Sequence, residues 1–402
     1  MSLDIIKAVS RLKAGKSPEH EDVLNEITVG INYLTEFWDK HYLADYIPYG
    51  GSRIQFITGG MGSGKSHVVE YFINNAVNYK VVSFSARKIW LHDFKEIFFE
   101  VLRQCDLEDC LQKCANIIIS EMGYSDADFD GNFLEYLATQ SQNDPITKRE
   151  IRQQLNCMFM QNPLMDSNFA FTCALLTGGL LGHPILEEPA REALLGWLSG
   201  SKEVKLSTLR NLGLSPVRIA KHHARHMLRS LVEVIKISGY KGLIIAIDDL
   251  DILVSKDSLE ELRYTRQKRD DVYESLRELI DEIDTLRNVF FLFAFDRKLI
   301  DNDVHGFKSY QALWLRMQNE IKSDRVNLFS SMIDLDTLPI YDVETIIELS
   351  ERVARIFNST GELPAKQISE HEAKELISKT VHGESSLPRN VILATLGQSE
   401  EN

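Results

Sequence analysis

Short apolar runs alternate along the chain with segments in which apolar residues recur at helical spacing. Four runs have the length and composition of buried strands, namely 53–58, 80–85, 242–247 and 288–295. Helical spacing is found in 66–76, 89–104 and 258–286, and an edge strand is predicted for 325–329. Largely apolar strands separated by helices are typical of a parallel sheet with helices on both faces. The pattern therefore predicts an α/β fold.

Two parts of the chain do not follow this alternation. Residues 105–200 are predicted to be mostly helical, and prolines separate the pieces. We interpret this segment as a helical insertion between the second and third strands, and residues 336–402 as a helical lid. The predicted core then consists of 51–104 and 201–335, preceded by an approach segment, 1–50.

The loop after the first strand carries a phosphate-binding motif. Residues 59–66 read GGMGSGKS and fit the pattern G-x-x-x-x-G-K-[ST] without a mismatch. Glycines let successive N–H groups face one point, where the N-terminus of the next helix adds partial positive charge. In this motif Lys65 reaches the β- and γ-phosphates, and the Ser66 hydroxyl ligates Mg²⁺. We expect a nucleoside triphosphate site that contains Gly59, Gly60, Met61, Gly62, Ser63, Gly64, Lys65 and Ser66.

A second motif lies at the end of the third predicted strand. Residues 242–251 read GLIIAIDDLD, in which an apolar run leads into a group of acids. A central parallel strand delivers such acids to the carboxyl edge of the sheet, beside the phosphate-binding loop. We expect Asp248 to hold Mg²⁺ and Asp249 to act as the general base on water. The alternative is a strand that ends in a solvated acidic turn.

Three further positions are expected to border the nucleotide. Asp296 ends the strand 288–295, where ring-type P-loop ATPases carry a polar sensor of the γ-phosphate; a simple strand-ending turn is the alternative. Ile27 and Val29 lie in the segment before the first strand, which in many P-loop ATPases lies against the base. We expect both to line an adenine pocket, with plain core packing as the alternative.

Composition limits the classes of partner. The 402 residues carry 45 basic and 59 acidic side chains, a net charge of −14, which argues against a broadly cationic surface. Five cysteines without paired metal-ligand spacing fit a reducing, intracellular setting. No apolar run is long enough to cross a bilayer, and no signal-peptide core is present, so a cytoplasmic protein without membrane contact is predicted.

Two basic clusters are candidates for contact with nucleic acid. One extends from Arg218 to Arg229 and includes three histidines; the other extends from Arg263 to Arg269. Lysine and arginine side chains in such clusters bind phosphates. The alternative interpretation for both clusters is a solvated helix face.

The order of these motifs resembles the ATP-binding proteins of the bacterial BREX phage-defence systems, the BrxD-like family. The similarity extends over about residues 1–395. It rests on segments that occur in the family's order, namely the N-terminal helix with Ile27–Gly30, the loop ending in Gly64–His67, Ala190–Gly200, Gly242–Asp251, Tyr273–Arg277 and His305–Leu313 with Arg316. The family usually has Glu where this chain has Asp249, and the shorter carboxylate leaves both the base assignment and the rate of hydrolysis open.

This resemblance implies an AAA+-like core that binds ATP and Mg²⁺, includes His67 in the nucleotide site, and works with other subunits of a defence or DNA-processing system. Pro388–Arg389, at the start of the last helix, resembles the second sensor of AAA+ ATPases, in which an arginine contacts the γ-phosphate. Arg316 is the candidate for a finger supplied to a neighbouring copy in a homo-oligomer. The favoured function is ATP hydrolysis that drives a conformational change. The alternative is an ATP-dependent switch or scaffold with little hydrolysis, as in KAP or STAND proteins.

Overall fold

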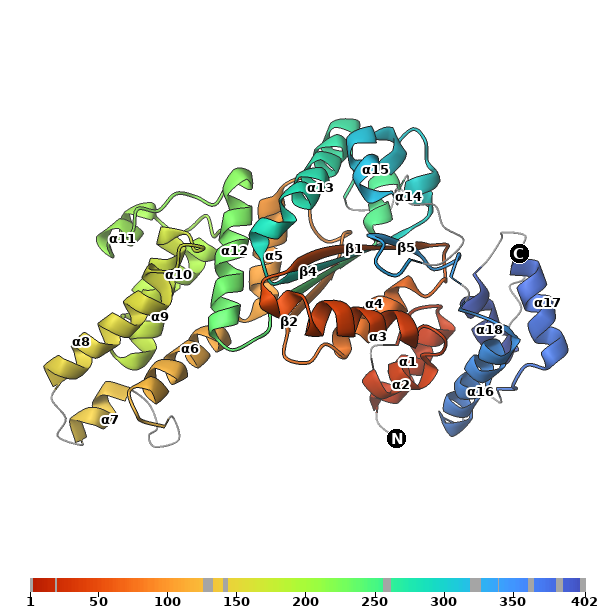
Figure 1. Cartoon of the computed structure of the whole chain (residues 1–402), viewed down its shortest axis with the longest axis horizontal. Coiled ribbons are helices and arrows are strands. Elements are labelled where there is room, and N and C mark those ends of the chain that lie inside the picture. Colours follow the sequence, from red (N-terminus) through yellow and green to blue (C-terminus); the bar gives the residue numbers. More distant parts are fainter. Residues whose placement is uncertain are drawn as a thin grey trace.

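A five-stranded parallel sheet lies at the centre of the molecule (Figure 1). The computed structural model describes residues 3–18, 20–125, 133–139, 144–255, 262–318, 327–338, 340–360, 365–380 and 386–397. The strand order is β2-β3-β4-β1-β5. The strands are β1 (Ser52–Gly59), β2 (Lys80–Ser85), β3 (Leu243–Asp248), β4 (Val289–Asp296) and β5 (Met332–Asp334). The predicted α/β fold with a parallel sheet is confirmed.

Helices occupy most of the remaining described chain. Those at the N-terminus and around the sheet are α1 (Leu3–Lys13), α2 (Glu21–Ile27), α3 (Asn32–Trp38), α4 (Lys65–Asn74), α5 (Phe94–Cys105), α12 (Lys221–Ile237), α13 (Arg266–Leu286), α14 (Lys298–Asp301) and α15 (Gln311–Met317). Between α5 and α12 lie α6 (Leu107–Glu121), α7 (Phe133–Thr139), α8 (Asp144–Leu155), α9 (Ser167–Leu181), α10 (Glu188–Leu198) and α11 (Leu206–Asn211). The C-terminal helices are α16 (Val343–Thr360), α17 (Glu370–Thr380) and α18 (Leu387–Thr395).

Successive side chains of a strand point to opposite faces of the sheet, and helices bury both faces. On β4, Phe291 and Phe293 belong to a core shared with α5, α12 and α13. The neighbouring Phe290 and Leu292 belong to a second core on the other face, shared with α3 and α4. An alternating polar pattern is absent from β4 because neither face of the strand meets water.

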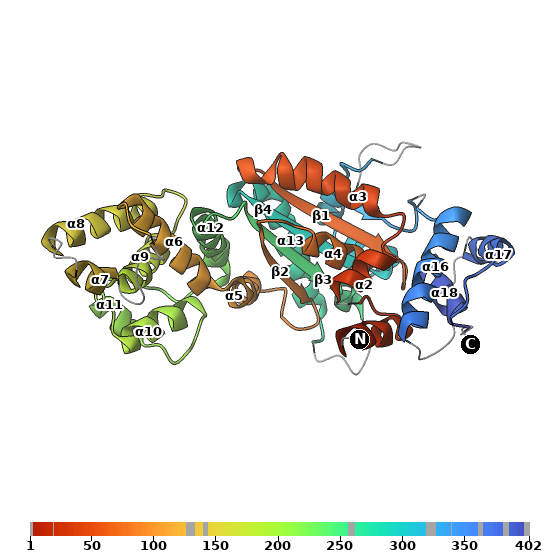
Figure 2. The same cartoon turned by 90° about the horizontal axis from the view of Figure 1, so that it is seen from below.

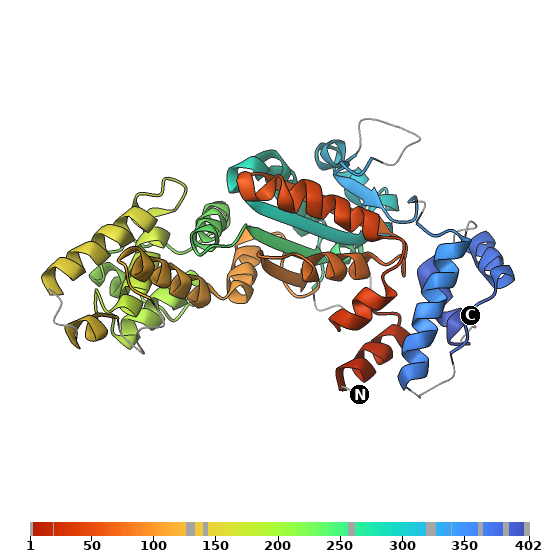
Figure 3. The same ribbon diagram turned by 60° about the horizontal axis from the view of Figure 1, so that its bottom comes forward.

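The two ends of the molecule are helical and come from different parts of the chain: α6–α11 lie between β2 and β3, and α16–α18 follow β5. Helices α6–α11 form a group beyond α5 and α12 at one end, and α16–α18 lie at the opposite end (Figures 1 and 2). Helices α1 and α2 lie beside α16–α18 although they are far apart in sequence (Figure 3), and Val9, Ile27 and Phe357 share a third core. Within the described part of the chain, no helix is both long and apolar enough to cross a membrane.

The starts of two predicted helices and the position of one predicted strand differ most from the structure. Helix α5 begins at Phe94 rather than at residue 89, because the Asp93 side chain caps it by accepting a hydrogen bond from Lys95 N. Helix α13 begins at Arg266, where Thr265 is the cap; residues 258–261 of the predicted helix lie outside the described residues. The edge strand predicted for 325–329 is wrong for its described part, 327–329, and the edge strand is β5 instead.

Candidate functional site

The phosphate-binding loop connects β1 to α4 and is fixed at its base by neighbouring strands. Gly62 and Gly64 have φ values of +85° and +93°, which only glycine adopts without strain. Gly60 N donates a hydrogen bond of 2.6 Å to the Asp336 carboxylate, which lies just after β5. Lys65 Nζ donates to the carbonyl oxygens of Gly59 and Gly60 at 3.0 and 2.7 Å. The lysine is therefore held within the curve of the loop.

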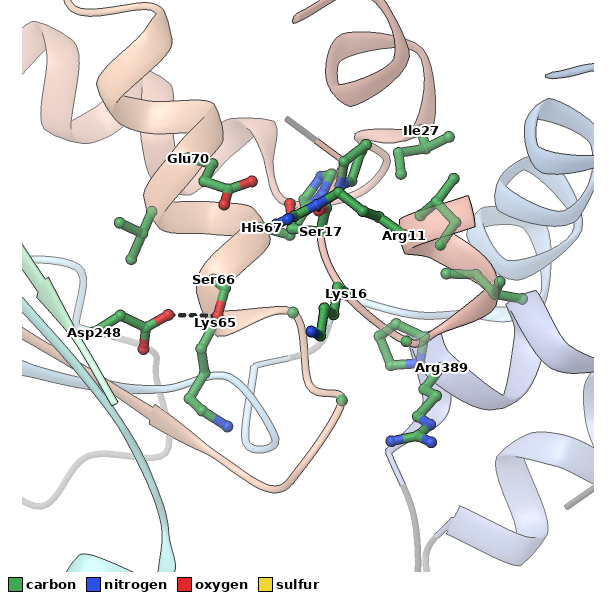
Figure 4. A pocket seen from close by; sticks show the side chains of 18 of the residues that line it. Arg11, Lys16, Ser17, Ile27, Lys65, Ser66, His67, Glu70, Asp248 and Arg389 are labelled. Atoms are coloured by element: carbon green, nitrogen blue, oxygen red, sulfur yellow. Dashed lines mark hydrogen bonds between the residues drawn. The ribbon is translucent and has the colours of Figure 1, made fainter. Parts of the chain in front are cut away.

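The structure brings the two expected Mg²⁺ ligands together. Ser66 Oγ, in the first turn of α4, donates a hydrogen bond of 2.5 Å to Asp248 Oδ2 at the end of β3 (Figure 4). Burial raises the pKa of the Asp248 carboxyl above its usual range. A hydroxyl and a carboxylate suit Mg²⁺, which takes its remaining ligands from water and substrate phosphates. These residues therefore fit the ion, although the described residues contain no group of three or more His, Cys, Asp or Glu side chains that could hold a metal by themselves.

Asp249 has an unusual backbone conformation and two polar neighbours. Its φ of +60° is rare for a residue other than glycine. Its carboxylate accepts a hydrogen bond of 2.5 Å from Ser85 Oγ, and Arg87 Nε lies 3.6 Å from Asp249 Oδ1. Arg87 also bonds Asp251 Oδ2 at 3.2 Å. The sequence motif did not identify Ser85 or Arg87, which reach the site from the end of the neighbouring strand β2.

Asp296 lies beside the phosphate-binding loop because β4 is placed between β1 and β3. In the register of the sheet Asp296 is opposite Gly59. Asp296 Oδ2 lies 3.9 Å from Lys65 Nζ, and Asp296 Oδ1 accepts a hydrogen bond from Lys298 N. A phosphate that binds Lys65 would therefore come close to the Asp296 carboxylate and could change its position.

A cavity of about 590 Å³ adjoins the loop and extends between the N-terminal helices and α18. Gly62, Gly64, Lys65, Ser66, Asp248 and Asp249 line it, together with Ile27 and Val29. Additional lining residues that sequence reasoning missed come from three separate segments, namely Leu12, Lys16, Pro18, Tyr341 and Ile392. A second hollow, of about 860 Å³, shares Lys65, Ser66 and Asp248 and includes Met61 and Asp296. The cavity thus has an apolar part beside the polar loop, as a nucleotide requires.

His67 lines the apolar side of the cavity in its neutral form. Burial lowers the pKa of its imidazole to about 4. The Thr28 hydroxyl donates to Leu24 O at 2.7 Å, so it accepts from His67 Nε2, which lies 2.8 Å away. The proton of neutral His67 is therefore on Nε2. This contact connects α4 with the segment after α2.

The structure separates the two predicted arginines. Arg389, near the start of α18, lines the cavity and lies against the loop, since a Cβ atom on Gly62 would come within 2.8 Å of Arg389 Cβ. Arg316, on α15, is outside both hollows. Arg316 Nε donates to Asp281 Oδ1 at 2.5 Å, and another of its nitrogens donates to Ala312 O. Of these two arginines, Arg389 lies beside the nucleotide site of its own chain and Arg316 does not.

The arginines of the two basic clusters are largely engaged within the chain. Arg225 bonds Glu278 at 2.8 Å, and Arg229 bonds Leu164 O at 2.8 Å. Arg269 is buried, where it donates to Leu253 O and contacts His305 Nδ1. Lys268 lies over the ring of Trp90, with its Nζ 3.5 Å from the centroid. These contacts hold helices α12 and α13 to their neighbours.

The parallel sheet with a glycine loop between β1 and α4 places the chain among the P-loop nucleotide-binding proteins. The family model for the BREX system ATP-binding protein BrxC/D matches residues 2–394. The chain therefore belongs to this family and is an ATP-binding protein of the BREX phage-defence system, as the resemblance predicted. Comparisons with curated proteins and with solved structures find no match.

Proposed function

We propose that this protein hydrolyses ATP to ADP and phosphate. The observation that carries the proposal is the 2.5 Å contact between Ser66 Oγ and Asp248, with Lys65 at the start of α4 and Asp296 at the end of β4 beside it. This arrangement assembles the positive charge, metal ligands and carboxylates that phosphoryl transfer uses. Mg²⁺ bound to Ser66 and Asp248 would neutralise negative charge on the phosphates.

In the proposed reaction the loop N–H groups and Lys65 bind and orient the phosphates. Asp249 accepts a proton from the attacking water. In this way it orients and activates the water for attack in line with the leaving group. Asp249 is suited to this role by its place one residue after Asp248. Its carboxylate accepts from Ser85 Oγ and lies near Arg87, and its remaining lone pairs can accept from the water.

Hydrolysis is expected to change the position of the helices that border the cavity. The cavity is lined by Arg389 of α18, by Leu349 of α16 and by residues from the N-terminal helices, which share one core with α16–α18. A γ-phosphate that binds Arg389 would draw this helical group toward the sheet, and its loss would release the group. We propose that the motion acts on other subunits of the defence system.

A second candidate function is an ATP-dependent switch with little hydrolysis. The observation that favours it is the contact between Asp249 Oδ1 and Arg87 Nε at 3.6 Å, because an ion pair can hold the carboxylate turned away from an attacking water. In such a protein, ATP binding alone would set the position of α16–α18, and exchange of nucleotide would reset it.

Steady-state phosphate release by the purified protein, alone and with added DNA, separates the two candidates. An ATPase is expected to release phosphate through many turnovers, and Lys65→Ala should remove that activity. Tight ATP binding with less than one phosphate released per chain, with and without DNA, would favour the switch and contradict hydrolysis.

A further inference from the structure

The turn between α1 and α2 holds one lysine over the nucleotide cavity. Gly15 N donates to Leu12 O at 3.0 Å, and Lys16 N donates to Arg11 O at 2.9 Å, which closes the end of α1. Arg11 Nε donates to Ser17 O at 2.8 Å and fixes the other side of the turn. Gly15 has a φ of +67°, a conformation that ends helices and favours glycine. The position of the Lys16 backbone is therefore well determined.

This turn lies close to the phosphate-binding loop because both contact the same arginine. A Cβ atom on Gly15 would be 3.3 Å from Arg389 Cζ, and one on Gly62 would be 2.8 Å from Arg389 Cβ. Lys16 and Gly62 line the same cavity. In the view of Figure 4, the Lys16 side chain lies between those of Lys65 and Arg389, which line the same cavity. Three cations from three separate segments thus surround one space.

Lys16 differs from Lys65 in its contacts. Lys65 Nζ donates to two loop carbonyls and lies near Asp296. Lys16 is exposed, and within the described residues its ammonium group has neither a hydrogen bond nor an ion pair. A lysine that lines a phosphate site without a partner of its own has its full charge available for a ligand.

We propose that Lys16 binds the polyphosphate of ATP. The nucleotide would then connect the N-terminal segment, through Lys16, to the sheet, through Lys65 and Ser66. A triphosphate, which carries more charge than a diphosphate and extends further along the loop, gains most from this second lysine. The proposal rests on ATP binding and is independent of hydrolysis, so a chain that binds ATP and releases no phosphate leaves it intact.

The test compares Lys16→Gln with Lys13→Gln in the full chain. Lys13 is three residues away and carries the same charge, but it does not line the cavity and lies over the Phe357 ring. Titration calorimetry would measure the affinity of a non-hydrolysable ATP analogue, ADP and AMP for each variant in the presence of Mg²⁺. Lys16→Gln should weaken the ATP analogue by about 10-fold, as expected for about 1.4 kcal/mol, with a smaller loss for ADP. AMP binding should change little.

Lys16→Arg is the conservative variant and should retain affinity within about 3-fold, because it keeps the charge. The loss in Lys16→Gln should decrease in high salt, since an exposed lysine acts through a screened interaction. An unchanged affinity of Lys16→Gln for the ATP analogue would overturn the proposal. Equal losses for the ATP analogue and AMP, or an equal loss in Lys13→Gln, would overturn it as well, because neither outcome requires contact between Lys16 and the β- or γ-phosphate.

Discussion

The basic residues of helix α12 and those around the nucleotide cavity are used in different ways. Arg225 and Arg229 on α12 contact acids, carbonyls and aromatic rings of their own chain. Lys16 and Lys65 line a cavity of about 590 Å³ that is large enough for a ligand. In the sequence the basic residues of α12 form one continuous cluster, whereas Lys16 and Lys65 lie in two separate segments.

The difference shows what distinguishes a structural cation from a binding cation. An arginine surrounded by carboxylates and carbonyls has already exchanged its hydrogen bonds with water for hydrogen bonds within the protein. A ligand would have to displace those partners. Lys65 faces the cavity but also bonds two carbonyls of its own loop, whereas Lys16 has neither a hydrogen bond nor an ion pair within the described residues and keeps its charge for an incoming anion. On this basis we expect α12 to stabilise the junction between the sheet and α6–α11, and we expect the cavity to bind the phosphates.

The first prediction concerns stability at α12. Arg225→Met removes bonds to Glu278, Glu282 and Ser275 and a contact with the Phe94 ring. We expect the free energy of unfolding in urea to fall by about 1–3 kcal/mol, with ATP affinity unchanged. Lys221→Met, at the exposed start of the same helix, is the control and should have little effect. Normal stability of Arg225→Met combined with loss of DNA binding would show instead that α12 is a contact surface.

The second prediction separates the two arginines that were assigned to the γ-phosphate. With ATP and Asp249→Asn we expect a higher oligomer than with ADP, measured by light scattering after size exclusion. Arg389→Ala should reduce the difference between ATP and ADP, because Arg389 lines the site of its own chain. Arg316→Ala should weaken both assembly and turnover, because Arg316 can reach only the nucleotide of a neighbouring copy.

Arg277→Ala is the matched control for Arg316→Ala, since both arginines bond the Asp281 carboxylate. An equal effect of the two substitutions would assign Arg316 to local structure alone. A monomer in every nucleotide state, with normal turnover in Arg316→Ala, would remove the ring-type mechanism and leave ATP binding unaffected.

The effect expected from His67 depends on pH. Its pKa is lowered to about 4 in the fold from an ordinary value of 6.5, so the unfolded chain binds more protons between these values. The free energy of unfolding should therefore decrease as pH falls from 6.5 to 4, by at most about 1.4 kcal/mol per pH unit from this group. In His67→Gln this part of the slope should be absent. Parallel pH profiles for the two proteins would contradict a neutral His67 in the folded protein.

The sheet and the phosphate-binding loop were predictable because both are encoded in short, continuous segments. Apolar runs identified four of the strands, and the spacing of the glycines identified the loop. The edge strand β5 was missed because it has only three residues and pairs on one side, with β1. Ser85, Arg87 and Lys16 were missed because the fold brings them to the cavity from separate segments, and no local pattern marks such residues. Arg316 was predicted as a finger for a neighbouring copy, and its place outside the site of its own chain leaves that role a prediction.

The most direct test of the account is phosphate release by Asp249→Asn at saturating Mg·ATP, with ATP affinity measured on the same sample. The substitution preserves size but removes the base, so affinity should stay within about 3-fold of the unchanged protein while turnover falls by about 100-fold or more. Asp251→Asn, which also removes a partner of Arg87, is the control and should retain turnover. Undiminished phosphate release by Asp249→Asn would contradict the assignment of Asp249 and move the base to another group at this edge of the sheet.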